Sequence, residues 1–358
     1  MDNIFDKKKF LNEKIDGKIK VIIDTDPGVD DAACLIYAFF DEYIDIKLLT
    51  TVVGNISLDK ATRNLLHLLD LFNLDIPVAR GAVKAMERES INAEFIHQAE
   101  GLGGYVPPKV CNKCLLKDSA VDALYRVIME GDGDIIPIAL GPQTNFGHLI
   151  KEHPDVVKKI PKIIFMGGSP FGHPDYPDHI SFNLSSDPEA FKIVLDSGIP
   201  LLMMPSDVGR RKAHLDEKFV NMLGSMNDAG KLLMQMYSKY WEPGYPDKRV
   251  ATNDTLALFA LVYPKMFTFR RTSVTVDLKD APGKTFIDFD DKGNVEFITD
   301  VDRDAFLNLL ICDLKKLNDL KFKKYFKNKK PPCKKLQGGL IYQFIFLFRF
   351  CYSPLFYQ

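Results

Sequence analysis

The chain has 358 residues, 46% of them hydrophobic, and a formal net charge of -1 at neutral pH. That length and apolar content suffice to bury a large core, in one large α/β domain or in two smaller ones. A nearly neutral chain has no general electrostatic attraction to nucleic acid or to an acidic membrane surface. We therefore expect a small-molecule substrate, with neither nucleic acid nor a membrane as partner.

The N-terminal residues are charged and lack the apolar core of a secretory signal, so we expect a cytoplasmic protein with reduced thiols. Among the six cysteines, Cys111 and Cys114 alone have the C-x-x-C spacing of redox or zinc sites. No second such pair and no histidine pair completes a zinc set. We interpret this segment as a loop with two free thiols.

Apolar runs rich in Ile and Val alternate with segments of helical spacing along the chain. In chain order, the expected strands are residues 20–24, 46–53, 135–140, 162–166 and 200–204. The expected helices are residues 31–40, 58–71, 120–130 and 188–197. This alternation predicts an α/β fold with three layers, in which helices cover both faces of a mostly parallel, Rossmann-like central sheet.

Residues 1–320 contain no internal repeat and no Gly/Ser linker, so we expect one domain, with the region after Arg270 as a peripheral layer. From Lys321 a basic run leads into an apolar, aromatic tail that Arg349 and Pro354 interrupt. The apolar part is short and broken for a membrane span. We expect residues 321–358 to be a disordered or alternatively spliced end, with membrane association as the alternative.

Four carboxylates fall within eight residues directly after the first expected strand: Asp24, Asp26, Asp30 and Asp31. Clustered carboxylates raise one another's pKa unless a cation or hydrogen-bond donors compensate, and oxygen-only ligands select calcium or magnesium over zinc. A helix cap would explain one carboxylate, such as Asp30, but not four. The cluster therefore predicts a metal site.

Candidate ligand-contact residues, most of them polar, also lie at or after the ends of other expected strands and at the start of a later helix, and ligand sites of parallel sheets lie at the carboxyl ends of their strands. The candidates, in chain order, are Asn55, Thr144, Asn145, Met166, Asn183, Asn253 and Asp254. Asn55 and Asn145 follow turn residues and could be structural, but their position at successive strand ends favours ligand contact. We expect one oxygen-rich pocket.

Together these segments resemble the nucleoside hydrolases, the inosine-uridine preferring ribohydrolase family. The resemblance covers about residues 18–320 and rests on six motifs in family order. They are Asp24-Thr-Asp-Pro-Gly-Val-Asp-Asp-Ala, Gly54-Asn55, Gly141-Pro-x-Thr-Asn145, Met166-Gly-Gly168, Phe182-Asn183 and Asp187-Pro-Glu-Ala190. The first motif is far more specific than a lone glycine-rich loop.

The resemblance implies a calcium ion (Ca2+) held by the carboxylates of Asp26, Asp31 and Asp254 and by the main-chain carbonyl of Thr144. Such a mixed oxygen shell suits calcium, and a metal lowers the pKa of the water that it binds. Asp26 would also be the general base that takes the proton of this water.

The resemblance assigns the substrate side chains as well. Asp30, Asn55 and Asn183 match positions that hold ribose hydroxyls, Met166 belongs to the substrate pocket, and Asp24 would support the turn. The implied reaction is hydrolysis of the N-glycosidic bond of a ribonucleoside to ribose and free base, through an oxocarbenium-like transition state. A role in purine and pyrimidine salvage and assembly as a homodimer or homotetramer are implied too.

Two positions depart from the family pattern. Asn253 stands where the family often has a histidine proposed to protonate the leaving base, and a neutral amide cannot act as a general acid. Ser181 stands where an acidic residue often binds the ribose 5′-hydroxyl. These departures put base preference and turnover in question, but not the metal site.

Other residues could contact the base. His97 matches a loop histidine near the base and is the first candidate, with a surface histidine of no role as the alternative. His173 and His179 lie in a loop that would close over the ribose. Tyr237, Tyr240 and Trp241 have helical spacing, which fits either core packing or stacking on the base.

Two alternatives to an active hydrolase stay open. The first is a ribonucleoside-binding protein on the same fold with impaired catalysis, which the departures at Asn253 and Ser181 motivate. The second is a phosphatase of the haloacid dehalogenase type, because Asp24-Thr-Asp26 resembles its Asp-x-Asp start. Gly28 stands where that phosphatase family has Thr or Val, which disfavours it.

Overall fold

The computed structural model describes residues 5–13, 17–108, 113–170, 180–241 and 247–317. The chain divides into two units, Met1–Leu320 and Lys321–Gln358, and only the first contains described residues. The predictions for Cys111, for His173 and His179, and for the tail fall outside these ranges. None of the described helices is long and apolar enough to cross a membrane.

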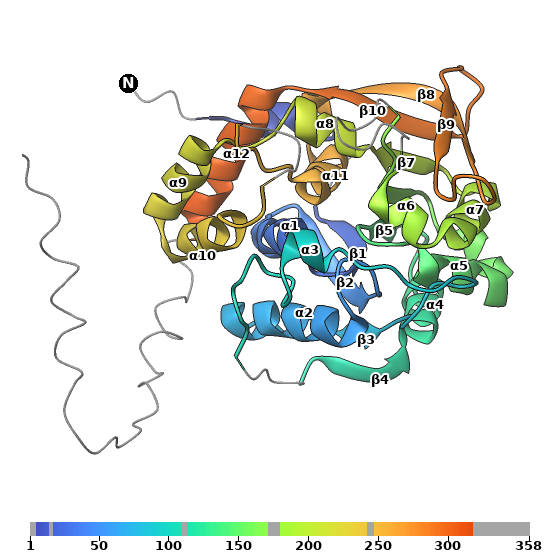
Figure 1. The fold of residues 1–358 in the computed structure, drawn as a ribbon. Coiled ribbons are helices and arrows are strands. Elements are labelled where there is room, and N and C mark those ends of the chain that lie inside the picture. The colour runs from blue at the N-terminus through green and yellow to red at the C-terminus, as the bar shows by residue number, and fades with distance from the viewer. Residues whose placement is uncertain (1–4, 14–16, 109–112, 171–179, 242–246, 318–358) are drawn as a thin grey trace, which may run out of the picture. The chain divides into compact units, whose positions relative to one another are not determined.

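The first unit is built on a ten-stranded sheet with the strand order β4-β3-β2-β1-β5-β6-β7-β10-β8-β9 (Figure 1). Neighbouring strands are parallel from β4 to β10, whereas β8 is antiparallel to β10 and β9 to β8. The strands are β1 (Ile19–Thr25), β2 (Ile44–Thr51), β3 (Val78–Arg80), β4 (Leu115–Ser119), β5 (Ile136–Ala139), β6 (Ile163–Met166), β7 (Leu201–Met204), β8 (Phe267–Val276), β9 (Thr285–Asp288) and β10 (Val295–Val301). The predicted α/β class with a mostly parallel sheet is confirmed.

Helices connect and cover these strands. The α-helices are α1 (Val29–Phe40), α2 (Leu58–Phe72), α3 (Glu94–His97), α4 (Ala120–Glu130), α5 (Thr144–Glu152), α6 (Phe182–Ser186), α7 (Pro188–Asp196), α8 (Ser206–Arg211), α9 (Glu217–Met226), α10 (Asp228–Tyr237), α11 (Asn253–Val262) and α12 (Arg303–Lys316). Short 3-10 helices are η1 (Lys7–Phe10), η2 (Pro154–Lys159) and η3 (Pro264–Met266). Every strand and helix predicted from periodicity is present, with its ends within two residues of the expected ones.

Two sets of helices cover the two faces of the sheet. Helices α1, α2, α11 and α12 form one layer, whereas α4, α5 and α7 pack together on the opposite face. One core cluster lies between the sheet and this second set and contains the fully buried rings of Phe146, Phe165, Phe191 and Phe297. The strand order reverses at β1, and crossovers of constant right hand then place the helices before and after that point on opposite faces.

The region after Arg270 is not a peripheral layer, and that expectation is wrong. Strand β10 lies inside the central sheet, parallel to β7 on one side and antiparallel to β8 on the other. Its inward side chains Val295 and Phe297 are fully buried. The chain therefore continues the sheet by a hairpin-like return instead of adding a separate layer.

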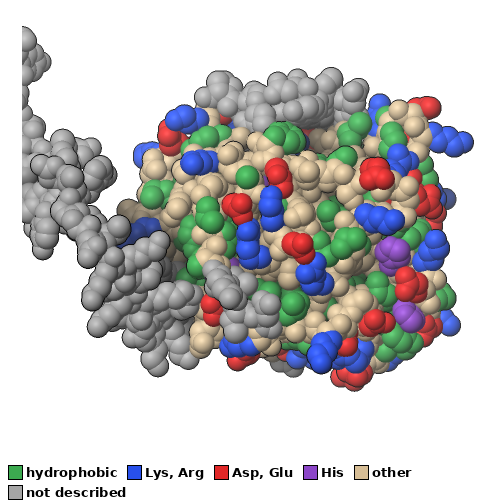
Figure 2. Space-filling view, turned by 60° about the horizontal axis from the view of Figure 1, so that its bottom comes forward, with side chains coloured by type: hydrophobic (Ala, Val, Ile, Leu, Met, Phe, Trp, Pro, Cys, Tyr) green, Lys and Arg blue, Asp and Glu red, His purple; other side chains and the backbone are tan. Residues whose placement is uncertain are grey.

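The surface carries both signs of charge. On the face in Figure 2, lysine and arginine side chains are interspersed with aspartate and glutamate, and no broad field of one sign is visible. This mixture agrees with the net charge of -1. Long-range attraction to a polyanion needs a concentrated basic region, which this face does not offer.

Candidate functional site

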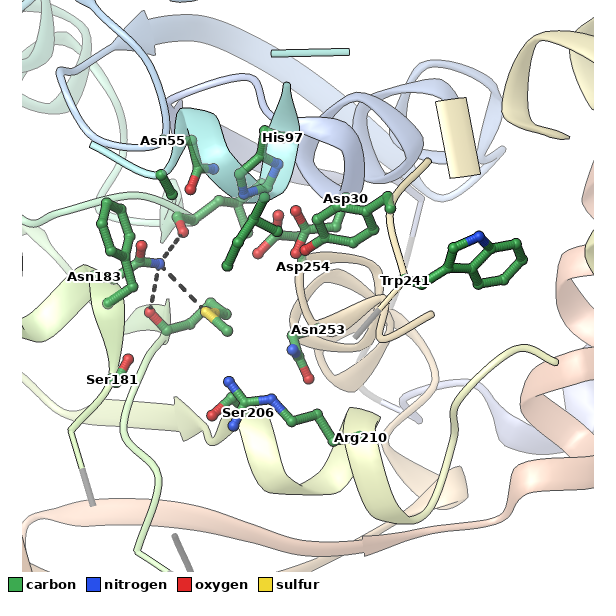
Figure 3. Close-up of a pocket in the computed structure, with 16 residues that line it drawn as sticks. Asp30, Asn55, His97, Ser181, Asn183, Ser206, Arg210, Trp241, Asn253 and Asp254 are labelled. Carbon is green, nitrogen blue, oxygen red and sulfur yellow. Dashed lines mark hydrogen bonds between the residues drawn. The ribbon is translucent and has the colours of Figure 1, made fainter. Parts of the chain in front are cut away.

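A pocket lies where the polar loops follow the carboxyl ends of the central strands (Figure 3). The predicted site residues that line it are Asp30, Asn55, His97, Met166, Asn183, Asn253 and Asp254. They come from the end of β6, from helices and loops that follow β1, β2, β3 and β6, and from the start of α11. The strand ends thus bring together residues that are more than 200 positions apart in sequence.

Three carboxylates form a group that could hold a metal ion. Oxygen atoms of Asp30, Asp31 and Asp254 lie within 4.8 Å of one another, and all three side chains are buried. Asp30 and Asp31 lie in the first turn of α1, and Asp254 lies in the first turn of α11. Helices α1 and α11 pack side by side, which brings the two first turns together.

Asp31 is held by donors from the turn that follows β1. Its Oδ1 accepts a hydrogen bond from Thr25 Oγ1 at 2.6 Å, and its Oδ2 accepts from the Gly28 amide at 3.1 Å and from Asn55 Nδ2 at 3.0 Å. The bond to Gly28 caps α1, because a side chain in the third helical position then satisfies the amide that precedes the helix. Asp31 therefore shapes the turn and also belongs to the group of three carboxylates that could hold a metal ion.

Asp26 lies beside Asp31 but outside the group of three, and it does not line the pocket. Its Oδ2 accepts from the Asn55 amide at 2.6 Å, and its buried Oδ1 has no hydrogen-bond partner among the described residues. Cβ atoms added to Gly54 or Gly141 would collide with this carboxylate. Only glycine leaves room for the side chain of Asp26 at these two strand ends.

The chemistry of this group fits a hard divalent cation. Burial raises the pKa of Asp26 well above its ordinary value, and the charge of Asp31 raises it further. Burial raises the pKa of Asp254 in the same way, followed by the charges of Asp30 and Asp31. Such carboxylates either take up protons or share a cation, and oxygen ligands suit calcium or magnesium. The predicted capacity to bind a metal is thus supported at the level of an acidic cluster.

Asp24 and Asn145 lie outside the pocket. Side chains alternate along a strand, so Asp24 points to the same face as Ile22, toward α5. There its Oδ1 accepts from Thr50 Oγ1 at 2.5 Å and from Asn145 Nδ2 at 2.7 Å. Burial raises the pKa of Asp24 to about 7, although both hydrogen bonds lower it.

Asn145 links neighbouring strand ends through its whole side chain. Its Nδ2 also donates to the Thr51 carbonyl at 3.1 Å, and its Oδ1 accepts from the Ala82 amide at 2.9 Å. The expected ligand contact of Asn145 is therefore not found. A polar residue at a strand end can hydrogen-bond to neighbouring strand ends and loops instead of contacting a ligand.

Asn183 and Thr144 are fixed by their neighbours. Asn183 Nδ2 donates to the Leu140 carbonyl at 2.5 Å and to the Met166 carbonyl at 3.2 Å, which bridges the ends of β5 and β6. Thr144 Oγ1 donates to Asp187 Oδ2 at 2.7 Å, and Asp187 also accepts from the amide of Ala190 in α7. Asn183 lines the pocket, whereas Thr144 lies behind it at the start of α5.

His97 is not a surface histidine. It ends α3, is buried, and stacks at a tilt against Tyr240 with 4.9 Å between ring centroids. Its Nδ1 accepts from the Val29 amide at 3.1 Å, so the proton of the neutral ring is on Nε2. Burial lowers the pKa of His97 to about 3. A Cβ at Gly28 would collide with this ring, which explains the glycine before α1.

The aromatic stripe divides between pocket and core. Tyr240 and Trp241 line the pocket. Tyr237 ends α10 and is fully buried, so it belongs to the core. Helical spacing alone could not separate these roles, because the helix ends after Tyr237 and the chain then changes direction.

Two polar pocket residues were not predicted. Ser206 and Arg210 lie on α8, which follows β7, and both line the pocket beside Ser181 and Asn253. The same reasoning that identified the other strand ends applies to β7 and could have found them. A charged residue on a short helix usually faces solvent. The residue type of Arg210 alone therefore gives no sign that it lines a pocket.

Comparison with known proteins decides the family. A model of the inosine-uridine preferring nucleoside hydrolase family matches residues 21–308. The chain belongs to this family. The phosphatase alternative is thereby excluded, and this nucleoside hydrolase is an enzyme that acts on N-glycosidic bonds.

Individual relatives agree. The nucleoside hydrolase is 33% identical over 294 residues to the non-specific ribonucleoside hydrolase RihC of Salmonella paratyphi B, a match that covers 80% of this chain and 95% of the relative. A plant nucleoside hydrolase, PpNRh1, has a similar structure with a TM-score of 0.76 and 29% identity. A purine-preferring ribonucleoside hydrolase from Gardnerella vaginalis gives a TM-score of 0.77 and 28% identity. Each structural match covers 83% of this chain and 98% of the other.

Proposed function

We propose that this protein hydrolyses ribonucleosides to ribose and free base with the help of a calcium ion. The observation that carries the proposal is the buried group of Asp30, Asp31 and Asp254, two members of which line a pocket that also has amides and aromatic rings. A carboxylate wall suits a sugar diol and a developing positive charge. Relatives named as ribonucleoside hydrolases support the same substrate class.

The proposed calcium ligands are the carboxylates of Asp26, Asp31 and Asp254 and the main-chain carbonyl of Thr144. When bound, calcium would lower the pKa of a water molecule and orient the 2′ and 3′ hydroxyls of the ribose. The domain that carries out the reaction would be residues 1–320. Asp24 would support the turn through Thr50 and Asn145.

Asp26 is the proposed general base. Its Oδ1 is free of hydrogen bonds from the described residues, and anionic neighbours make its carboxylate more basic. Both properties favour uptake of a proton from water. Asn55 holds the other oxygen and so fixes the direction in which Oδ1 points.

The ribose would lie against Asp30, Asn55 and Asn183. Since the Nδ2 group of Asn183 is bound to two carbonyls, its Oδ1 is the atom left to accept a hydrogen bond from a ribose hydroxyl. The carboxylate of Asp30 would favour the oxocarbenium-like transition state. Molecules without a 2′-hydroxyl should be poor substrates, because one anchor is lost.

The leaving base would meet His97, Tyr240 and Trp241. A pKa of about 3 keeps His97 neutral near pH 7, so it can donate a hydrogen bond from Nε2 but does not supply an imidazolium proton. Asn253 also lacks a proton to give. Stacking that makes a purine more basic would then favour inosine and guanosine over uridine.

The test is ribose release by the full-length protein from inosine, guanosine, adenosine, uridine and cytidine, with and without a chelator. We expect release that the chelator abolishes, and a loss of about 100-fold or more in kcat for Asp26→Asn, since general bases contribute roughly that much. Asp59→Asn serves as a control, because this exposed carboxylate at the start of α2 lies outside the pocket. Tight calcium binding without release would contradict the proposal and favour the ribonucleoside-binding protein.

We further propose a homodimer or homotetramer that works in the cytoplasm in purine and pyrimidine salvage. The free thiols of Cys34 and Cys312 fit a reducing compartment. Light scattering on the purified protein would give the oligomeric state directly, and a monomeric mass would contradict the assembly.

A further inference from the structure

The pocket is electrically asymmetric. Among the described residues that line it, the carboxylates are Asp30 and Asp254, and the one permanently charged cation is Arg210. In Figure 3, Asp30 and Asp254 lie near His97, whereas Arg210 lies on the side of Ser206 and Ser181. A ligand that fills this pocket therefore meets anionic groups at one flank and a guanidinium group at the other.

Arg210 is directed into the pocket by its surroundings. Its Nη1 donates to Ser169 Oγ at 3.5 Å, in the turn that follows β6, and its main-chain carbonyl accepts from Arg249 Nη1 at 3.1 Å. The buried carboxylate of Asp207 accepts from the same Ser169 hydroxyl at 3.4 Å. Asp207 does not line the pocket, whereas Arg210 does.

The structure of a ribonucleoside indicates which part of the substrate would lie at each flank of the pocket. If the 2′ and 3′ hydroxyls contact the carboxylates, the base on C1′ and the C5′ carbon on C4′ extend from opposite ends of the sugar ring. The stacked rings of His97 and Tyr240 mark the side of the base. The C5′ substituent then points to the flank of Ser181, Ser206 and Arg210.

We propose that the enzyme accepts ribonucleoside 5′-monophosphates, with Arg210 and the hydroxyl of Ser181 binding the phosphate; this rests on the function proposed above. A guanidinium presents donors in the geometry that phosphate oxygens accept, and a serine hydroxyl adds a neutral donor. Ser206 Oγ donates to the Gly168 carbonyl at 3.1 Å and so holds this flank in place. Arg210 is thus a specificity-determining residue.

The reaction at the sugar is the same for both substrates. The oxygen of water bonds to C1′, the C1′–N bond breaks, and its electron pair leaves with the base, which ends with a proton from the water. The phosphate ester is untouched, so the products are ribose 5-phosphate and free base. This product separates the proposal from the action of a phosphatase followed by nucleoside hydrolysis.

The experiment compares inosine with inosine 5′-monophosphate, and guanosine with guanosine 5′-monophosphate, on the full-length protein with calcium. Sugar products are identified by mass spectrometry. We expect ribose 5-phosphate, with a kcat/KM for the monophosphate at least equal to that for the nucleoside. Arg210→Gln should lower the ratio of the two values by about tenfold or more, and Arg210→Lys should restore part of it.

Arg211→Gln is the matched control, because this exposed neighbour on α8 does not line the pocket, and it should leave the ratio unchanged. Hydrolysis of nucleosides with no ribose 5-phosphate from monophosphates would overturn the inference and leave the proposed function standing. An equal fall of both kcat/KM values in Arg210→Gln would also overturn it. If neither substrate reacts although calcium binds, the proposed function itself fails.

Discussion

His97 illustrates how one side chain can join two parts of a site. Its Nδ1 accepts the amide of Val29, next to Asp30, and its ring packs on Tyr240 from a segment far along the chain. The first contact fixes the tautomer and the second fixes the plane of the ring. A neutral histidine fixed in this way offers a hydrogen-bond donor in a constant direction, independent of pH over the neutral range.

A pH dependence of stability follows from this burial. The pKa of His97 is about 3 in the folded protein and 6.5 when exposed, so between these values the unfolded chain binds a proton that the folded chain does not. The contribution of His97 is fully present above pH 6.5 and is lost as pH falls toward 3. Urea unfolding of wild type and His97→Gln in chelator should show a stability difference that shrinks between pH 7 and pH 4.

The stability of His97→Gln must be subtracted from that of the wild type at each pH, because Asp24 changes stability with pH in the opposite direction. Its folded pKa is about 7 against an ordinary value of 3.8, so Asp24 lowers stability as pH rises through this interval. The Asp24 contribution is common to wild type and His97→Gln and cancels in the difference. A difference that stays constant from pH 7 to pH 4 would refute the role of His97.

At the level of single residues, the sequence predicts which chemical groups gather near the site better than it predicts which way each side chain points. The carboxylates of Asp30, Asp31 and Asp254 were predictable, because few structures need so many acids after a strand. Asn145 and Arg210 were not, since an amide or a guanidinium at a strand end can turn either to the sheet or to the pocket. That choice depends on which face of α5 or α8 carries the side chain, and this is set by packing.

At the level of elements, the loop that carries α3 is held in position by hydrogen bonds from α2. Asn64 of α2 is fully buried, and its Nδ2 donates to the Pro27 carbonyl at 3.1 Å and to the Glu100 carbonyl at 2.9 Å. One amide thus joins the carboxylate turn to the loop after His97. This link sets the distance between the metal-binding group and the proposed base side of the pocket.

Replacement of Asn64 by alanine should therefore act on both stability and substrate binding. The buried Pro27 carbonyl and the part-buried Glu100 carbonyl each lose a donor, which costs about 1–3 kcal/mol of unfolding free energy, and KM should rise more than kcat falls. The control is Lys60→Gln on the same helix, which removes the partly exposed ion pair with Glu94 and should cost roughly 0–1 kcal/mol. Equal effects of the two variants in urea unfolding and in kinetics would argue against the special position of Asn64.

The elements that sequence reasoning found share one property. Strands buried on both faces read as continuous apolar runs, as in β1, β6 and β7, and these were located closely. Strand β3 has three residues, and β4 is a half-exposed edge strand whose last three side chains are exposed, so neither gives a run to detect. The order of β10 and β8 depends on long-range pairing that local periodicity does not contain.

For the first unit as a whole, the N-terminal segment is tied to the last helix. Lys7 of η1 is buried, and its Nζ lies 2.9 Å from Asp313 of α12 and 3.8 Å from Asp41. Burial alone would lower the pKa of Lys7, but Asp313 and Asp41 raise it, so the ammonium stays charged at neutral pH. The two ends of the described fold are thereby joined through a buried ion pair.

Lys7→Met should destabilise the whole domain. It removes the buried cation that lies between the carboxylates of Asp313 and Asp41, which costs about 3–5 kcal/mol. The exposed neighbour in Lys8→Met should change stability by less than about 0.5 kcal/mol. Chemical denaturation in urea measures both. A Lys7→Met protein as stable as Lys8→Met would mean that the N-terminal segment is not part of the cooperative unit.

The reversal of strand order at β1 also separates the carboxylate turn from the C5′ flank along the gene, while Asp254 completes the carboxylate group from the later part of the chain. The carboxylate turn, Asn55 and His97 are encoded before β5, whereas Ser181, Ser206 and Arg210 are encoded after it. Substitutions at Ser181, Ser206 or Arg210 that suit a different group on C5′ need not alter the turn between β1 and α1. Proteins with this topology can therefore change their substrate while they keep the residues that cleave the glycosidic bond.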